Sequence, residues 1–256
     1  MNQNELQDGL NIICGNGGDS MGKSVLLFSG GMDSYAIAKL TSPDILLYCN
    51  IGLPEQMNEI QSINAMNLDG FNVIFDDRLY LRDQKLNNEI VPMRNLFFVM
   101  IGAYYGSHVT LGATAGDTTN DKDYEFADKT NEVLRHIFSN PNKNPSTIMG
   151  SKGFTVSLPY KDKTKSQIVK EYIDAKFSIR ELVNTRSCYS SGEKECGVCR
   201  SCLRKFVAFA SNGIDISSHF GINPMTSIDS ALNYAIAKNR GEEINEIRVA
   251  IKNMGG

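Results

Sequence analysis

Short apolar runs alternate along the chain with longer segments whose apolar residues recur at helical spacing. Each run is four to eight residues long and is bounded by polar or glycine-rich residues, which is typical of a buried strand. The runs cover residues 25–28, 44–51, 71–75, 108–112 and 154–158. The segments with helical spacing cover residues 33–40, 54–67, 93–105, 124–138 and 163–175.

This alternation predicts an α/β fold in which five parallel strands form one sheet with helices on both faces. Such a doubly wound, Rossmann-like sheet binds ligands at the carboxyl ends of its strands. The 256 residues suit one such domain with an appendage better than two full domains. We expect an N-terminal extension over residues 1–24, the sheet domain over 25–180 and a small C-terminal lobe over 181–256, with tail helices near 228–238 and 242–252.

Composition and charge narrow the class of protein. Apolar residues make up 41% and charged residues 21% of the chain, which predicts a packed core. The net charge of −3 argues against a general binder of nucleic acid or of anionic membranes. The chain has neither an apolar run that could span a bilayer nor the pattern of a signal peptide at its start. We therefore expect a cytoplasmic protein without direct contact to nucleic acid, and its tail is a candidate contact in a homodimer.

The residues after the first strand have the composition of a phosphate-binding turn. A turn between a strand and a helix directs free backbone N–H groups and the positive end of the helix dipole at one place, which suits phosphate. Adjacent glycines let the backbone approach the anion, and serine hydroxyls add donors. The candidate phosphate-binding residues are Ser29, Gly30, Gly31, Met32, Asp33 and Ser34. The carboxylate of Asp33 could instead serve only as a helix cap.

A second phosphate-binding pattern overlaps the start of the first strand. Residues 17–24 fit the G-x-x-x-x-G-K-S/T pattern of a Walker A loop, which ends here in Lys23 and Ser24. That motif requires a long helix directly after the Lys-Ser pair, whereas an apolar strand and two glycines follow in this chain. We therefore interpret residues 15–24 as a polar turn that leads into the strand, with a short extra strand over 10–14.

Arg94 and Asn95 begin the helix 93–105, which is otherwise apolar. One interpretation is that they cap this helix and face solvent. The other is that Arg94 points into the active cleft, where its guanidinium group would bind a phosphate or a carboxylate. The residue types alone do not distinguish the two.

Cysteines cluster in the C-terminal part of the chain. Four of the six follow the spacing C-x7-C-x2-C-x2-C, at Cys188, Cys196, Cys199 and Cys202. Four thiolates at such spacing predict one tetrahedral structural zinc with no open coordination position. An iron–sulfur cluster and a redox-active set of cysteines are the alternatives that the spacing leaves open.

The loop and the cysteine motif together resemble the 7-cyano-7-deazaguanine synthase (QueC) family of PP-loop ATP pyrophosphatases, which split ATP between its α and β phosphates. The resemblance runs in order from about residue 25 to residue 209. Besides the loop it comprises Val-Pro-Met-Arg-Asn at 91–95, Leu-Gly at 111–112 with Asp117 and Asp123 after it, Leu-Pro at 158–159, Lys165, Ser-Cys-Tyr at 187–189 and Cys-Gly-Val-Cys-Arg-Ser-Cys-Leu-Arg at 196–204.

The resemblance implies a PP-loop, HUP-like fold with a zinc-binding lobe, and it favours zinc over iron. It implies that ATP and Mg²⁺ bind at the loop and that the other substrates are 7-carboxy-7-deazaguanine and ammonia. The product would be 7-cyano-7-deazaguanine (preQ0), formed through an acyl-adenylate and an amide with release of AMP and pyrophosphate. In this scheme the catalytic residues are Asp33, Arg94 and Lys165. The substrate-binding residues are Arg94, Asn95, Asp117 and Asp123.

Three other functions are compatible with the same motifs. The enzyme could stop at the amide or transfer the acyl group to another acceptor, in a DNA-modification or defence pathway. It could be a different PP-loop enzyme, such as a tRNA thiolase, which would require a pair of catalytic cysteines near ATP. It could also be a non-catalytic module that binds zinc and a nucleotide without turnover.

Overall fold

The computed structural model describes residues 22–87, 90–138, 153–186, 188, 190, 192 and 194–255. The expected strand over 10–14 and most of the Walker-like pattern lie outside these residues. The end of that pattern is described: Lys23 lies in the turn before the first strand, and Ser24 begins the strand itself. No helix follows the Lys-Ser pair directly, as the interpretation of residues 15–24 as a turn requires.

Five parallel strands form one sheet in the order β3-β2-β1-β4-β5. Their bounds are Ser24–Leu27 for β1, Ile45–Cys49 for β2, Val73–Asp76 for β3, His108–Leu111 for β4 and Thr155–Ser157 for β5. The predicted fold class is therefore confirmed. The order of the strands reverses between β1 and β4, so the carboxyl end of β1 lies at the switch point where such sheets bind ligands.

Helices connect the strands and continue beyond the sheet. Their bounds are Met32–Thr41 for α2, Gln56–Asn64 for α3, Arg94–Gly102 for α4, Tyr124–Phe138 for α5, Lys165–Asp174 for α6, Ile179–Val183 for α7, Arg200–Ala210 for α8, Ile228–Ala237 for α9 and Gly241–Met254 for α10. Short 3-10 turns are η1 at Arg82–Gln84, η2 at Asn120–Lys122, η3 at Ser217–His219 and η4 at Pro224–Ser227. In the part of the chain that the structure describes, no helix is long and apolar enough to cross a membrane.

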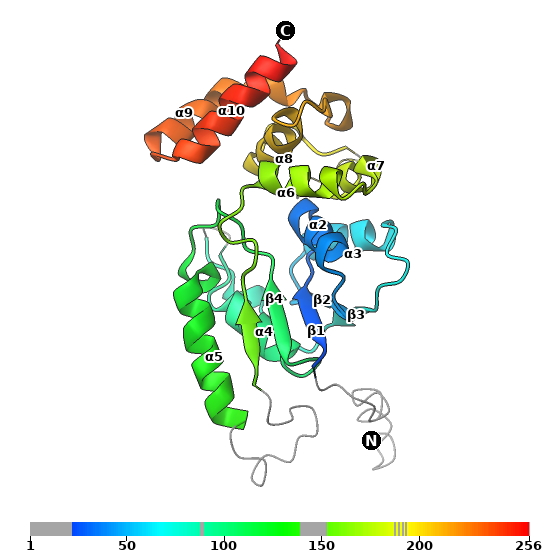
Figure 1. The fold of residues 1–256 in the computed structure, drawn as a ribbon, viewed down its shortest axis with the longest axis vertical. Helices are drawn as coiled ribbons and strands as arrows, with labels where there is room; N and C mark the ends of the chain where they lie inside the picture. The colour runs from blue at the N-terminus through cyan, green and yellow to red at the C-terminus, as the bar shows by residue number, and fades with distance from the viewer. Residues whose placement is uncertain are drawn as a thin grey trace.

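The two faces of the sheet belong to two different apolar cores. Successive residues of a strand point to opposite faces. Val25 of β1 packs in a core with Val99 of α4 and Ala127 of α5. Leu26, the next residue, packs in the core that contains Tyr35 of α2. Figure 1 accordingly shows α5 on one side of the strands and α2 and α3 on the other.

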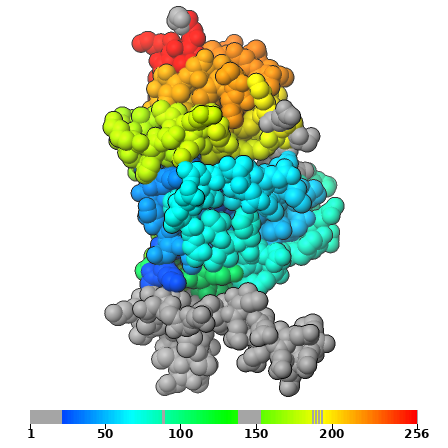
Figure 2. All heavy atoms as spheres, turned by 90° about the vertical axis from the view of Figure 1, so that its right-hand side faces the viewer, coloured from blue at the N-terminus to red at the C-terminus, as the bar shows by residue number. Residues whose placement is uncertain are grey.

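The second of these cores continues from the sheet into the C-terminal lobe. It contains Tyr172 of α6, Phe206 and Phe209 of α8, and Ile247 of α10. Figures 1 and 2 show the same layering from two sides, with the sheet below, α6 and α7 above it, and the last helices at the far end. The lobe therefore lies over the carboxyl ends of the strands. A domain boundary between residues 180 and 181 remains a prediction.

A buried lysine joins the parts of this lobe. Lys205 of α8 is 1% exposed, and its ammonium group donates to the carbonyl oxygens of Val183 and Thr185 and to the carboxylate of Glu195. The three donors of an ammonium group are thus matched by three acceptors from the segment between α7 and α8 and the end of α7.

Replacing this lysine should destabilise the fold strongly. Lys205→Met leaves Glu195 without its buried counter-ion, and we expect the free energy of unfolding to fall by about 3–5 kcal/mol. Chemical denaturation would measure it, with Lys194→Met as the control, because Lys194 is an exposed lysine of the same lobe. Equal stability of the two variants would contradict this structural role.

Candidate active site and metal centre

The 29–34 loop forms the connection between β1 and α2. Gly30 has a φ of 69°, and a Cβ atom there would lie 2.5 Å from Cγ1 of Ile63, so the position requires glycine. Gly31 is the N-cap of α2. The hydroxyl of Ser34 donates to the Gly31 carbonyl oxygen at 3.0 Å and lies 3.2 Å from the Ser29 hydroxyl. These contacts hold the turn between β1 and α2 in place, and phosphate binding at this turn stays a prediction.

Met32 can contribute only its backbone to this loop. Its side chain is 2% exposed and packs in the core beneath α2. The first backbone N–H groups of a helix have no partner within the helix, and those of α2 include that of Met32. Together with the exposed Ser29, they provide the donors that an anion requires.

Asp33 and Lys165 meet beside the loop. The Lys165 ammonium forms an ion pair with Oδ2 of Asp33, although the two residues are 132 positions apart. Lys165 is held in place by the capping box of α6, in which Thr164 and Gln167 exchange hydrogen bonds. The other oxygen of Asp33, Oδ1, is buried and has no hydrogen-bond partner among the described residues. A buried carboxylate oxygen without a donor is costly, so this atom fits a cation such as Mg²⁺ or a donor on a ligand.

The carboxyl end of β4 brings further polar groups to the same edge of the sheet. Burial would raise the pKa of Asp117, but the charge of Lys122, the N–H of Thr114 and the charges of Lys165 and Arg204 lower it below its usual value. Asp117 is therefore ionised. The hydroxyl of Thr114 is a second buried oxygen atom without a hydrogen-bond partner in the described part of the chain. Thr114 could not be predicted as a site residue, because a threonine after a strand is common.

Arg94 lies at the start of α4, opposite the acidic residues near α3. Burial would raise the pKa of Glu55, but the ion pair with Lys85 and the charge of Arg94 lower it. Burial raises the pKa of Glu59, while the charge of Arg94 acts against that rise. The backbone of Glu59 in turn lies next to Gly30. The charge of Arg94 therefore acts on both glutamates, and binding of a phosphate or a carboxylate by Arg94 stays a prediction.

The remaining predicted substrate residues lie between α4 and α5. Asn95 is 7% exposed, and its amide donates to the carboxylate of Asp121 at 2.8 Å. Asp123 accepts a hydrogen bond from the backbone N–H of Phe126 at 2.8 Å and so caps α5. Sequence reasoning did not single out Asp121 as a partner of Asn95. Substrate contacts of Asn95, Asp117 and Asp123 stay a prediction.

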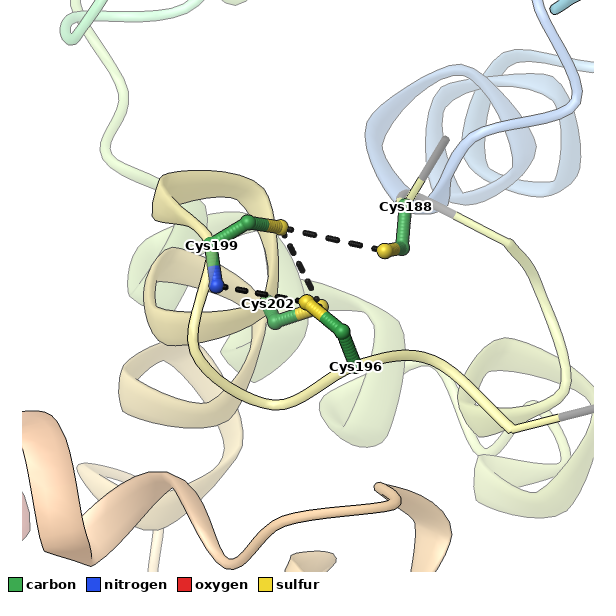
Figure 3. A group of neighbouring side chains, drawn as sticks. All are labelled: Cys188, Cys196, Cys199 and Cys202. Atoms are coloured by element: carbon green, nitrogen blue, oxygen red, sulfur yellow. Dashed lines mark hydrogen bonds between the residues drawn. The ribbon is translucent and has the colours of Figure 1, made fainter. Parts of the chain in front are cut away.

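The four clustered cysteines converge on one point (Figure 3). All four sulfur atoms lie within 4.8 Å of one another, and the Sγ–Sγ distance is 3.4 Å for Cys199–Cys202, 3.7 Å for Cys196–Cys202 and 3.8 Å for Cys188–Cys199. A single tetrahedral ion with bonds of about 2.3 Å to sulfur places the sulfur atoms about 3.8 Å apart. A multi-iron cluster would separate the sulfur atoms further, so the geometry fits one zinc ion.

Hydrogen bonds and burial shift the pKa of the clustered thiols in different directions. Burial would raise the pKa of Cys188, but hydrogen bonds with Cys196 and with Ser190 lower it to about 6. Burial raises the pKa of Cys199 and of Cys202. A bound cation would favour ionisation of both, because coordination to a metal deprotonates a thiol.

Comparisons with known proteins agree with this geometry. The family model described as queuosine biosynthesis protein QueC matches residues 55–213. The 7-cyano-7-deazaguanine synthase 2 of Colwellia psychrerythraea is 26% identical over 233 residues, covering 79% of this chain and 100% of the relative. The 7-cyano-7-deazaguanine synthase of Psychromonas ingrahamii is 24% identical over 226 residues, covering 75% of this chain and 95% of the relative. The 7-cyano-7-deazaguanine synthase of Chlorobaculum parvum is 31% identical over 143 residues, covering 52% of this chain and 56% of the relative.

Proposed function

The chain belongs to the QueC family of queuosine biosynthesis proteins, and from this premise we propose that it converts 7-carboxy-7-deazaguanine and ammonia into 7-cyano-7-deazaguanine. ATP is consumed and AMP and pyrophosphate are released, which makes the protein an ATP-dependent ligase. The observation that carries the proposal is the pairing of Asp33 with Lys165 beside a phosphate-binding loop at the switch point of the sheet. Two relatives aligned over 95% or more of their own length bear the name of this synthase.

In the proposed site the 29–34 loop holds the β and γ phosphates of ATP. The N–H groups at the start of α2 and the hydroxyls of Ser29 and Ser34 donate to the phosphate oxygens. Lys165 offsets the negative charge that pyrophosphate carries as it leaves. Mg²⁺, when bound through Oδ1 of Asp33, would offset further phosphate charge. These groups are positioned before reaction, so they stabilise the developing charge without reorganisation.

The proposed reaction has two steps that consume ATP, and each can be written so that all atoms balance. A carboxylate oxygen of the acid attacks the α phosphorus, and pyrophosphate leaves. Ammonia attacks the acyl carbon of the adenylate, AMP departs with the oxygen that bridged carbon and phosphorus, and the amide remains after loss of protons. The amide oxygen attacks the α phosphorus of a second ATP and a second pyrophosphate leaves, after which departure of a second AMP and loss of the amide protons leave the nitrile. Each of the two carboxylate oxygens therefore leaves in one molecule of AMP.

We propose further residues for binding the substrate at this centre. Arg94 would bind the carboxylate or a phosphate with its guanidinium group. Asn95, Asp117 and Asp123 are the other proposed substrate-binding residues. The zinc ion, held by four thiolates, has no open position and stabilises the lobe without taking part in the reaction.

Isotope labelling of the acid tests the reaction sequence. With both carboxylate oxygens replaced by oxygen-18, we expect one labelled oxygen atom in every AMP and none in the organic product. Mass spectrometry of AMP and of the deazaguanine product would measure this, and unlabelled acid is the control. ADP formed in an acid-dependent manner would contradict the proposal.

The same experiment identifies the main alternative. An enzyme that stops at the amide, or passes the acyl group to another acceptor, releases one AMP per acid and leaves the second labelled oxygen in the product. A non-catalytic nucleotide-binding module releases no labelled AMP. The three patterns of label are distinct, and the mass of the product distinguishes the amide from a transferred acyl group.

A further inference from the structure

A cavity of about 480 Å³ lies next to Lys165. Its walls come from the β4–α5 loop, the start of α6, α8 and the C-terminal hairpin, which we define as α9 and α10 over residues 228–254. Cavities of about 300–1,000 Å³ hold small molecules in proteins. Because Lys165 is paired with Asp33, the cavity adjoins the proposed adenylation centre directly.

The C-terminal hairpin packs against α8 through buried side chains. Ile228 and Ala235 of α9 and Ile247 and Ala250 of α10 are buried in the core that the hairpin shares with α8. Glu246 of α10 also accepts a hydrogen bond from the hydroxyl of Thr164, the residue directly before Lys165. The hairpin lies beyond residue 213, where the match to the family ends, so its contribution to the cavity is not part of the matched region.

Two arginines on α8 bring positive charge to the cavity, and the charge of Arg204 also acts on Asp117. Arg200 and Arg204 are one helical turn apart and both line the cavity. Within the residues that the structure describes, neither forms an ion pair with a carboxylate. Arg240 of the hairpin, by contrast, is paired with Glu243 at 3.0 Å. Planar guanidinium groups suit a carboxylate or a phosphate, which they bind through two parallel hydrogen bonds.

The hairpin adds an aromatic face and an acceptor. The guanidinium carbon of Arg200 lies 5.2 Å from the centre of the Tyr234 ring, and that of Arg240 lies 5.5 Å from it. This places a planar cation on an aromatic ring at the cavity wall. The carboxylate of Glu246 can accept hydrogen bonds from ring N–H groups of a ligand. A flat, nitrogen-containing ring that carries a carboxylate complements all three features.

We propose that the C-terminal hairpin completes the substrate site, with Tyr234 and Arg200 holding a planar heteroaromatic carboxylic acid in the cavity and its carboxylate directed toward Lys165. This inference rests on the proposed function, since adenylation requires the carboxylate within about 3–3.5 Å of the α phosphorus. Tyr234 and Arg200 thereby determine which acids are accepted, while the residues around Asp33 carry out the reaction.

Titration of the full-length chain with 7-carboxy-7-deazaguanine tests the inference. We expect Tyr234→Ala and Arg200→Gln each to raise the dissociation constant of the acid at least tenfold, and to raise its KM without changing the KM for ATP. Tyr234→Phe keeps the ring and should bind the acid like the wild type. Arg248→Gln is the matched control, because Arg248 is exposed on α10 and does not line the cavity.

The outcomes separate the two proposals. If the wild type binds the acid and releases pyrophosphate, and both Tyr234→Ala and Arg200→Gln behave like Arg248→Gln, the hairpin proposal is wrong and the proposed function stands. If the wild type neither binds the acid nor releases pyrophosphate with it, the proposed function fails and the hairpin proposal fails with it. Thermal unfolding of each variant shows whether any loss of binding reflects loss of the fold.

Discussion

Removing the metal from the cysteine cluster should unfold the C-terminal lobe and lower the free energy of unfolding by about 5 kcal/mol or more. Binding of structural zinc contributes about 10–16 kcal/mol in small zinc peptides, and that energy is available only to the folded state. Here Cys199 is the N-cap of α8, and Cys202, Phe206 and Phe209 of that helix are fully buried. Loss of the metal therefore releases the start of a helix on which the core of the lobe depends.

Three measurements check this result. Metal analysis should find one zinc ion per chain in the wild type and none in Cys199→Ala, and denaturation should show the lower stability. Cys49→Ala is the matched control, because Cys49 is a buried cysteine of β2 that does not belong to the cluster. At low temperature, the folded fraction of Cys199→Ala should keep its activity, since the ion takes no part in the reaction. Stoichiometric iron with visible absorbance would contradict the assignment of zinc.

The cysteine site was predictable from the sequence because its ligands are close along the chain. Three of the four lie between residues 196 and 202, and Gly197 gives the turn between them the φ of 82° that it needs. The sheet was predictable for a similar reason. Each strand is a short apolar run between polar turns. The alternation of these runs with helices predicts one architecture, a parallel sheet with helices on both faces. The 29–34 loop belongs to the same class of local signals.

Features that depend on distant segments were not predictable in this way. The helix over Arg200–Ala210 was not predicted, because Lys205 interrupts the apolar pattern of its buried face. An apolar pattern gives no reason to bury a lysine, and only the acceptors from residues 183, 185 and 195 explain it. The cavity beside Lys165 has the same origin. The hydrogen bond between Thr164 and Glu246 joins residues 82 positions apart, and spacing along the chain contains no information about it.

Two features of the candidate site could not be predicted either. Within the described residues, the hydroxyl of Thr114 and Oδ1 of Asp33 have no hydrogen-bond partner. Both are ordinary residues at the ends of elements, and only burial without a partner distinguishes them. Natural proteins rarely bury polar oxygen atoms without a hydrogen bond, so each such atom requires an explanation. A ligand that occupies the carboxyl ends of β1 and β4 explains both at once, since each residue follows one of these neighbouring strands.

Replacing Asp33 by asparagine should therefore abolish most of the activity while leaving the fold intact. Asp33→Asn keeps the shape of the side chain but removes the charge that pairs with Lys165 and that would bind Mg²⁺. We expect kcat/KM for acid-dependent pyrophosphate release to fall by about 10²–10³, the range for loss of one group that stabilises charge in a transition state. The cost in stability should stay within about 2 kcal/mol, because the amide oxygen of asparagine can still accept a hydrogen bond from Lys165, whose side chain is partly solvated.

The controls separate a catalytic ion pair from an ordinary one. Lys170 and Asp174 form an exposed ion pair on α6, and Asp174→Asn should change neither activity nor stability by a measurable amount. Lys23→Ala tests the Walker-like pattern and should also keep its activity, since Lys23 precedes β1 and not a helix. Lys165→Met should match Asp33→Asn in its loss of kcat/KM, because the two groups act on the same phosphates. If Asp33→Asn instead lost stability and kept its turnover per folded molecule, the carboxylate would be a helix cap, and the site of ATP cleavage would have to be sought elsewhere.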